Sequence, residues 1–120
     1  MGSFIVDGGR PLRGEIKPQG AKNEALQVIC ATLLTPEKVT ISNIPDISDV
    51  NKLIELISCL GVKISRESGS AISFEAVDID LDYLQTPQFR TQSSSIRGSI
   101  MIVGPLLARY GRAYIPKPGG

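Results

Sequence analysis

The sequence predicts a mixed α/β (α+β) domain in which amphipathic helices alternate with short strands. Apolar residues recur at helical spacing over 22–34 and again over 50–60. Short segments that alternate apolar and polar residues follow both stretches, as half-buried strands do. A length of 120 residues is enough for one domain with a hydrophobic core. The expected order of elements is β-α-β-α-β-β, which is typical of layered α/β or α+β folds.

Local signals place the elements of the first third of the chain. Short strands are expected over 3–6 and 12–16, because turn residues separate two apolar runs. A helix is expected over 22–34, where a threonine and a proline end it, and a strand over 39–42. The apolar face of this helix would comprise Leu26, Ile29, Cys30, Leu33 and Leu34.

A second helix and a hairpin are expected next. Asp46 or Ser48 can cap the helix, and Gly61 ends it in a position that suits a left-handed conformation. The strands 62–65 and 72–75 then form a hairpin across a turn rich in serine and glycine. The helix would bury Val50, Leu53, Ile54, Ile57 and Leu60.

The last third of the chain predicts one long helix. The polar segment 78–88 is expected to be a connection, and a helix follows over 92–110. Apolar residues surround most of this helix, so it should be buried, with a kink at Gly104-Pro105. A last strand is expected over 112–115. The order helix, tight turn, strand and proline occurs twice in the chain, which hints at a repeated unit.

The composition argues against several classes of partner. There are 13 basic and 12 acidic residues and no strongly charged block, so neither a nucleic-acid groove nor an anionic membrane surface is expected. No apolar run reaches the roughly 18 residues of a membrane span. The N-terminus lacks the layout of a signal peptide, which predicts a cytoplasmic protein.

Two cysteines and no histidine restrict the chemistry. Cys30 is expected in the core and Cys59 near the end of the second helix, and their spacing matches neither a metal motif nor a disulfide framework. Without histidine the chain cannot build a nucleophile activated by an imidazole base. Hydrolysis by a zinc site is therefore not expected either.

A first candidate site lies where the first helix begins. Lys22 and Asn23 fall in its first turn, where free N–H groups and the helix dipole favour phosphate or carboxylate. A cation there opposes the dipole by about 0.3–1 kcal/mol, and such broken local rules tend to mark functional sites. The alternative is a solvated surface lysine whose charge Glu24 offsets.

A second polar cluster precedes the expected third helix. Ser93, Ser94 and Ser95 could cap its free N–H groups, and Gly98 would allow a close approach to the backbone. Arg97 is again a cation in a first helical turn, and its planar guanidinium matches phosphate or carboxylate. The alternative is an arginine paired with a carboxylate at the edge of the core. Two such helix starts favour a shared anionic ligand.

Three motifs resemble one enzyme family. They are the run from Gln19 to Leu26, the segments 97–100 and 104–111, and the closing Pro118-Gly119-Gly120. In this order and spacing they resemble the enolpyruvyl transferases, over the whole chain. Ala21-Lys22-Asn23 favours the branch that acts on UDP-N-acetylglucosamine, because the shikimate branch shows serine, lysine and serine there.

The resemblance implies a reaction and residue roles. The family transfers enolpyruvate from phosphoenolpyruvate to the 3-hydroxyl of UDP-N-acetylglucosamine and releases phosphate, the first committed step of peptidoglycan synthesis for the bacterial cell wall. By this resemblance Lys22 is catalytic and contacts phosphoenolpyruvate, Asn23 contacts the sugar substrate, and Arg97 binds an anionic group. Pro118, Gly119 and Gly120 would lead into the loop that carries the general acid. The resemblance implies no metal and no organic cofactor.

The resemblance also implies a division of the chain. The family fold is a two-domain inside-out α/β barrel built from β-α-β-α-β-β units. Residues 1–20 would be strands that pair with the other domain, and residues 21–120 an incomplete first domain that ends at the catalytic loop. The chain would be an N-terminal fragment that is inactive alone. The alternative function is a non-catalytic module that binds a nucleotide sugar or associates with itself.

Overall fold

The computed structural model describes residues 2–114. These residues form a three-stranded sheet, helices, and short 3-10 helices labelled η. In chain order the elements are α1 (Lys22–Ala31), η1 (Thr32–Leu34), β1 (Val39–Ile41), α2 (Ser48–Cys59), β2 (Lys63–Arg66), β3 (Ile72–Glu75), η2 (Leu81–Gln85), α3 (Pro87–Ser94), η3 (Arg97–Ile102) and α4 (Val103–Tyr110).

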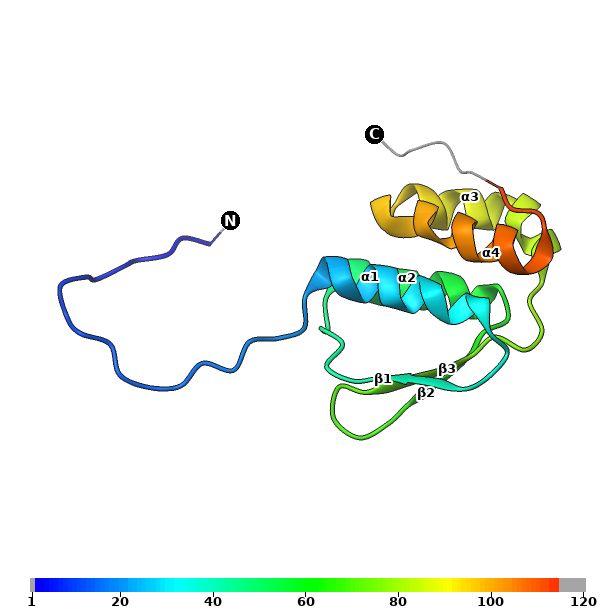
Figure 1. Ribbon diagram of the computed structural model, residues 1–120. Coiled ribbons are helices and arrows are strands. Elements are labelled where there is room, and N and C mark those ends of the chain that lie inside the picture. The colour runs from blue at the N-terminus through cyan, green and yellow to red at the C-terminus, as the bar shows by residue number, and fades with distance from the viewer. Residues whose placement is uncertain (1, 115–120) are drawn as a thin grey trace.

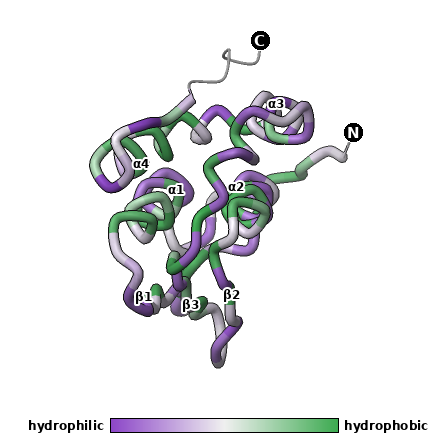
Figure 2. Tube along the Cα trace, turned by 90° about the vertical axis from the view of Figure 1, so that its right-hand side faces the viewer, coloured by the Kyte–Doolittle hydropathy of each residue, from purple (hydrophilic) through white to green (hydrophobic). Residues whose placement is uncertain are grey.

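The elements stack in layers. Figure 1 shows α1 and α2 side by side on one face of the sheet, with α3 and α4 on the far side of this helix pair. In Figure 2, α4 lies over α1 and α3 lies over α2. The α1–α2 pair is thus the middle layer and has to bury apolar side chains toward both neighbours.

The sheet has the order β1-β3-β2, with both pairs antiparallel. Val39 and Ile64 lie opposite Phe74 on its two sides. Ile72 and Phe74 are buried, as expected for alternate residues that face the helices. The predicted strand over 39–42, the second helix and the hairpin are confirmed, and the first helix is confirmed as α1 continued by η1.

The core follows the predicted apolar spacing of the two middle helices except at Leu34, which is 51% exposed because the chain has changed to the 3-10 helix η1 there. On α1 the buried apolar residues recur every three to four positions, and on α2 they form one continuous stripe. All of these side chains join a single cluster with β3 and the outer helices. Its largest fully buried members are Phe74, Phe89, Ile29, Leu33, Leu53, Leu56, Ile57, Leu60, Ile102 and Leu106.

Two glycines fix where the middle helices begin and end. A Cβ on Gly20 would lie 1.9 Å from the backbone oxygen of Asn43, so only glycine permits this approach just before α1. Gly61 has φ +109°, and a Cβ there would lie 2.4 Å from the backbone oxygen of Asp78. The predicted left-handed end of α2 at Gly61 is confirmed.

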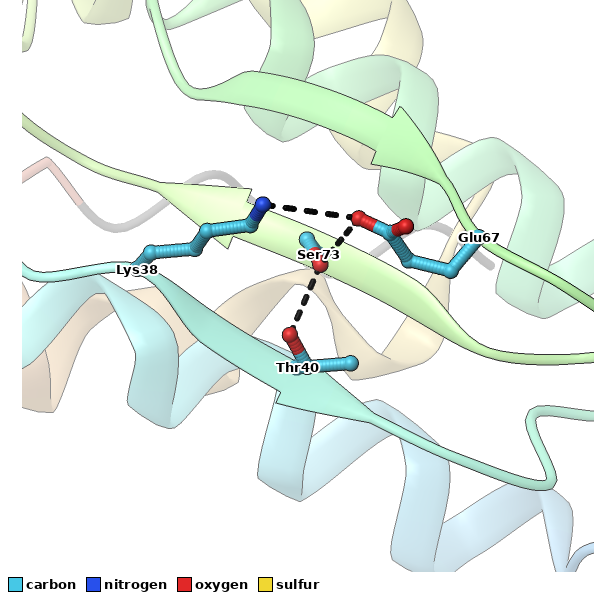
Figure 3. A network of polar contacts seen from close by, with 4 residues as sticks. All are labelled: Lys38, Thr40, Glu67 and Ser73. Carbon is cyan, nitrogen blue, oxygen red and sulfur yellow. Dashed lines mark hydrogen bonds and ion pairs between the residues drawn. The ribbon is translucent and has the colours of Figure 1, made fainter.

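Polar side chains join the strands on the sheet face opposite the helices (Figure 3). Thr40 and Ser73 lie opposite each other in the register, and their hydroxyl oxygens are 2.7 Å apart. Ser73 donates to Oε1 of Glu67 at 2.9 Å, and Lys38 lies 3.5 Å from the same oxygen. The hydrogen bond from Ser73 and the ammonium of Lys38 hold the pKa of the Glu67 carboxyl below its usual value.

The strands predicted over 3–6 and 12–16 are wrong. Residues 2–20 contain no strand, and Figure 1 shows them leaving the layered body as a single extended segment. Phe4 and Leu12 are 98% and 97% exposed. A strand pattern forms a strand only when its backbone groups find partners, and this segment has none among the described residues.

The single long helix predicted over 92–110 is also wrong. The chain breaks at Ile96, whose φ of −130° and ψ of 111° are extended, and then forms η3 and α4. Pro105 does not kink the helix, because it is the third residue of α4, where an N–H would lack a partner within the helix.

The segment predicted as a connection over 78–88 contains helical structure. It forms η2 and the start of α3, where the Thr86 hydroxyl accepts from the N–H of Phe89 and Pro87 takes the first helical position. The strand predicted over 112–115 is absent from 112–114, and residue 115 lies outside the described residues. The second copy of the predicted repeat is therefore incomplete in the described chain.

The lowered pKa of Glu67 predicts a specific loss of stability in acid. A carboxyl whose pKa is lowered by folding stabilises the fold above its unfolded pKa of about 4.5, and this contribution disappears as the pH falls through the lower folded value. Glu67→Gln should therefore lower the urea midpoint at pH 7, with a difference from the parent chain that shrinks toward about pH 3. Glu37→Gln, which removes another exposed acid, is the control. A difference that stays constant with pH would contradict the prediction.

Candidate functional site

The candidate site begins at the start of α1, where the backbone is open to a ligand. Ala21 is the N-cap residue with an extended backbone, and no side chain caps the helix. The first backbone hydrogen bond runs from the N–H of Ala25 to the carbonyl of Ala21 at 3.0 Å. The N–H groups of the first turn therefore have no acceptor within the helix. Lys22 and Asn23 are exposed in this turn, as the sequence predicts.

The ammonium of Lys22 forms an ion pair, and its partner is not the Glu24 that the sequence suggested. Its Nζ lies 3.2 Å from Oδ2 of Asp49, a residue in the first turn of α2. Both side chains are about half exposed, at 48% and 45%, so the pair contributes little to stability. Its effect is on position, because it holds the ammonium between the starts of α1 and α2.

Sequence reasoning missed Asp49. It expected a cap from Asp46 or Ser48, but the N-cap residue of α2 is Ile47 and no side chain caps this helix. Asp46 instead accepts a hydrogen bond from the Asn51 amide at 2.7 Å. The sequence does show an acid in the first turn of α2, a position that the helix dipole favours. Its pairing with Lys22 could not be predicted, because it depends on how the two helices pack.

Arg97 starts the 3-10 helix η3 instead of a long α-helix. It is exposed, and no ion pair joins it to any residue between 2 and 114, so the predicted alternative of a carboxylate partner is not observed. The prediction for the preceding serines is wrong. Their hydroxyls donate to backbone carbonyls three residues earlier, at the end of α3, and cap nothing that follows.

Close packing brings Arg97 beside the first half of α1. A Cβ on Gly98 would lie 3.1 Å from Cδ1 of Leu26, so η3 approaches α1 closely at this point. Leu26 lies one turn after Asn23, and Figure 1 shows the segment between α3 and α4 over the beginning of α1. The structure thus packs η3, which begins at Arg97, against the first half of α1, which begins at Lys22 and Asn23.

A hollow of about 150 Å³ borders the start of α1 and the chain at the end of β1. Glu24, Ala25 and Val28 line it, together with the backbone before α1 and the end of β1. Neither Lys22, Asn23 nor Arg97 lines this hollow, and the charged group at its wall is a carboxylate. Its surface suits an apolar or neutral group better than an anion.

The two cysteines and the other predicted features lie outside this site. Cys30 is buried, which raises the pKa of its thiol to about 12, and Cys59 is exposed. No group of three His, Cys, Asp or Glu side chains within the described range could hold a metal ion. Pro118, Gly119 and Gly120 lie outside the described residues. No helix of residues 2–114 is long and apolar enough to cross a membrane.

The described residues form a mixed helix and sheet domain with the cation of Lys22 at an open helix start. The family model for EPSP synthase (3-phosphoshikimate 1-carboxyvinyltransferase) matches residues 6–119. The chain belongs to this family of carboxyvinyltransferases.

The relatives point to one branch of the family. The chain is 56% identical to the UDP-N-acetylglucosamine 1-carboxyvinyltransferase of Bacteroides thetaiotaomicron, 55% to that of Bacteroides fragilis and 52% to that of Porphyromonas gingivalis. Each match covers all 120 residues of this chain and 28% of the relative. The chain thus corresponds to the N-terminal part of these relatives.

The close approach of Gly20 to the backbone of Asn43 predicts that a methyl group at position 20 destabilises the fold. Gly20→Ala should lower the free energy of unfolding by about 1–3 kcal/mol, because a backbone oxygen cannot move aside easily. A Cβ on Gly104, in α4, would have no atom within 4 Å. Gly104→Ala should therefore raise the free energy of unfolding by about 0.5–1 kcal/mol, because alanine favours a helix more than glycine does. Urea unfolding of the two variants measures both values. Equal effects would show that Gly20 is not constrained as described.

Proposed function

We propose that this chain is the N-terminal part of a UDP-N-acetylglucosamine 1-carboxyvinyltransferase of the cytoplasm. Such an enzyme would move enolpyruvate from phosphoenolpyruvate to the sugar 3-hydroxyl, release phosphate, and supply precursors of bacterial peptidoglycan. The observation that carries the proposal is the uncapped start of α1, which has Lys22 in its first turn and η3, the element that begins at Arg97, packed against Leu26. The identity of 52–56% to three relatives of that name supports it.

The proposed roles follow from charge and backbone geometry. Lys22 is the first residue of α1, where free N–H groups favour anions. Its ammonium would therefore bind phosphoenolpyruvate and stabilise the negative charge that develops during transfer. An incoming anion would compete with Asp49 for this ammonium. Asn23 offers amide groups for the sugar, and the Arg97 guanidinium offers a planar pair of donors for a phosphate or carboxylate.

The division of the chain is part of the same proposal. Residues 1–20 would pair with strands of the second domain of the inside-out barrel, and residues 21–120 would begin the first domain. Large apolar side chains along 4–16, exposed in the described structure, support a buried position in the longer protein. The rest of the site, including the general acid beyond Pro118-Gly119-Gly120, would come from the rest of the enzyme.

This proposal predicts weak ligand binding without turnover by the 120-residue chain. Lys22→Ala should weaken binding of phosphoenolpyruvate at least about tenfold, because a charge-assisted hydrogen bond contributes about 1.5–3 kcal/mol. A titration followed by the phosphorus NMR signal of the ligand, in the presence of UDP-N-acetylglucosamine, measures this.

Lys63→Ala is the matched control, because it removes an exposed lysine from β2, outside the helix starts of α1 and α2. Equal affinities of the parent chain and Lys22→Ala would refute the role of Lys22. Phosphate release by the chain alone would refute its dependence on the rest of the enzyme.

A further inference from the structure

A second hollow, of about 180 Å³, lies between the start of α2 and the turn that joins β2 to β3. Figure 1 shows both at the end of the layers where α1 begins. Drug-sized ligands occupy about 300–1,000 Å³, so this hollow suits a smaller molecule. Charged or polar side chains line it beside an apolar floor, and they belong to Asp46, Asn51, Arg66 and Ser70.

The frame of this hollow is held by the backbone and by the hydrophobic core. The N–H of Ile44 donates to the carbonyl of Ser70 at 3.1 Å, which ties the segment before α2 to the β2–β3 turn. Within the turn, the N–H of Glu67 donates to the carbonyl of Ala71 at 2.9 Å. Ile44 and Ile72, which form the floor, are 6% and 3% exposed. A ligand would therefore enter a shape that the fold already fixes, which favours binding.

Arg66 brings a cation to the hollow from the sheet. It lies opposite Ile72 in the register of β2 and β3, and residues directly opposite each other share a face of the sheet. Because Ile72 is buried against the helices, Arg66 lies on the face that the helices cover. Its guanidinium is exposed, and no ion pair joins it to any residue from 2 to 114. This planar fork of donors is suited to a carboxylate.

Asp46 brings the opposite charge from the start of α2. Its Oδ1 accepts a hydrogen bond from the Asn51 amide at 2.7 Å, which positions the carboxylate. Among the described residues no cation forms an ion pair with Asp46, although Arg66 lines the same hollow. A simple anion would be repelled by Asp46, and a simple cation by Arg66. A molecule that carries both charges can satisfy both residues.

We propose that this hollow binds a small zwitterion, which is a molecule with one ammonium, one carboxylate and a short aliphatic body, such as an amino acid. Asp46 would accept hydrogen bonds from the ammonium, and Arg66 would donate to the carboxylate. The aliphatic body would contact the apolar floor formed by Ile44 and Ile72. The Ser70 hydroxyl can donate to the carboxylate or accept from the ammonium.

The test is a titration of the isotopically labelled chain, followed by its backbone amide shifts. Two zwitterions, valine and 4-aminobutyrate, carry their charged groups close together and far apart, respectively. Butyrate and butylamine each carry only one of the two charges and are the matched control ligands. At least one zwitterion should shift the amides of residues 51 and 69–71, with an affinity at least about tenfold above that of either control ligand.

Variants of the two charged residues assign the binding to the hollow. Asp46→Asn and Arg66→Gln should each weaken binding of the zwitterion at least about tenfold, because each removes a charge-assisted hydrogen bond. Glu55→Gln and Lys63→Gln make the same changes of charge at exposed positions on α2 and β2 that do not line the hollow. These two controls should leave the affinity nearly unchanged. Urea unfolding of each variant shows that it is folded.

Three outcomes would overturn the proposal. In the first, neither zwitterion binds the parent chain with a dissociation constant in the millimolar range or below. Arg66 would then only discourage strand pairing at the edge of the sheet. In the second, butyrate or butylamine binds as tightly as the zwitterions, so that the hollow selects a single charge. In the third, the control variants weaken binding as much as Asp46→Asn and Arg66→Gln do.

The outcome is independent of the proposed function. Lys22, Asn23 and Arg97 do not line this hollow. Binding of phosphoenolpyruvate by the parent chain and by Lys22→Ala therefore tests the transferase site, whereas binding of valine and 4-aminobutyrate tests the zwitterion site. Either proposal can fail while the other holds.

Discussion

The guanidinium of Arg109 ties the layers of the fold together. From α4, its Nη1 donates to the carbonyl of Leu33 at 3.1 Å, where the first helix ends, and to the carbonyl of Ala76 at 2.6 Å, just after β3. These carbonyls are orphaned where their elements end, so one side chain satisfies acceptors of the middle layer and of the sheet. Arg109 thereby fastens α4 to η1 and to the chain that follows β3.

The site that results depends on helix starts more than on a deep cleft. The first turn of α1 supplies free N–H groups and a cation, α2 supplies the acid that orients this cation, and η3 brings a second cation close to α1. An anion of a substrate would replace interactions that the protein makes only weakly, because Lys22 and Asp49 are both about half exposed. Completion of the site in the proposed enzyme would require polypeptide beyond these residues.

The sequence predicted those features that local patterns determine. The helix start at Lys22 and the end of α2 at Gly61 follow from apolar spacing and from glycine, and both are confirmed. The break at Ile96 was missed because serine hydroxyls bond to the backbone there and end α3, whereas apolar spacing alone continues the helix. The pairing of Lys22 with Asp49 was missed because it needs the packing of two helices. The strands predicted before residue 20 are wrong because a strand forms only when its backbone groups are paired, and this segment finds no strand partner among residues 2–114.

The measurement that tests the central claim most directly is the map of backbone amide shifts when phosphoenolpyruvate and UDP-N-acetylglucosamine are added to the isotopically labelled chain. If the start of α1 and η3 form one ligand site, the largest shifts will fall together at residues 22–24 and 96–98, at the same ligand concentrations. Shifts confined to one of these segments, or centred on β2 and α2, would contradict the account.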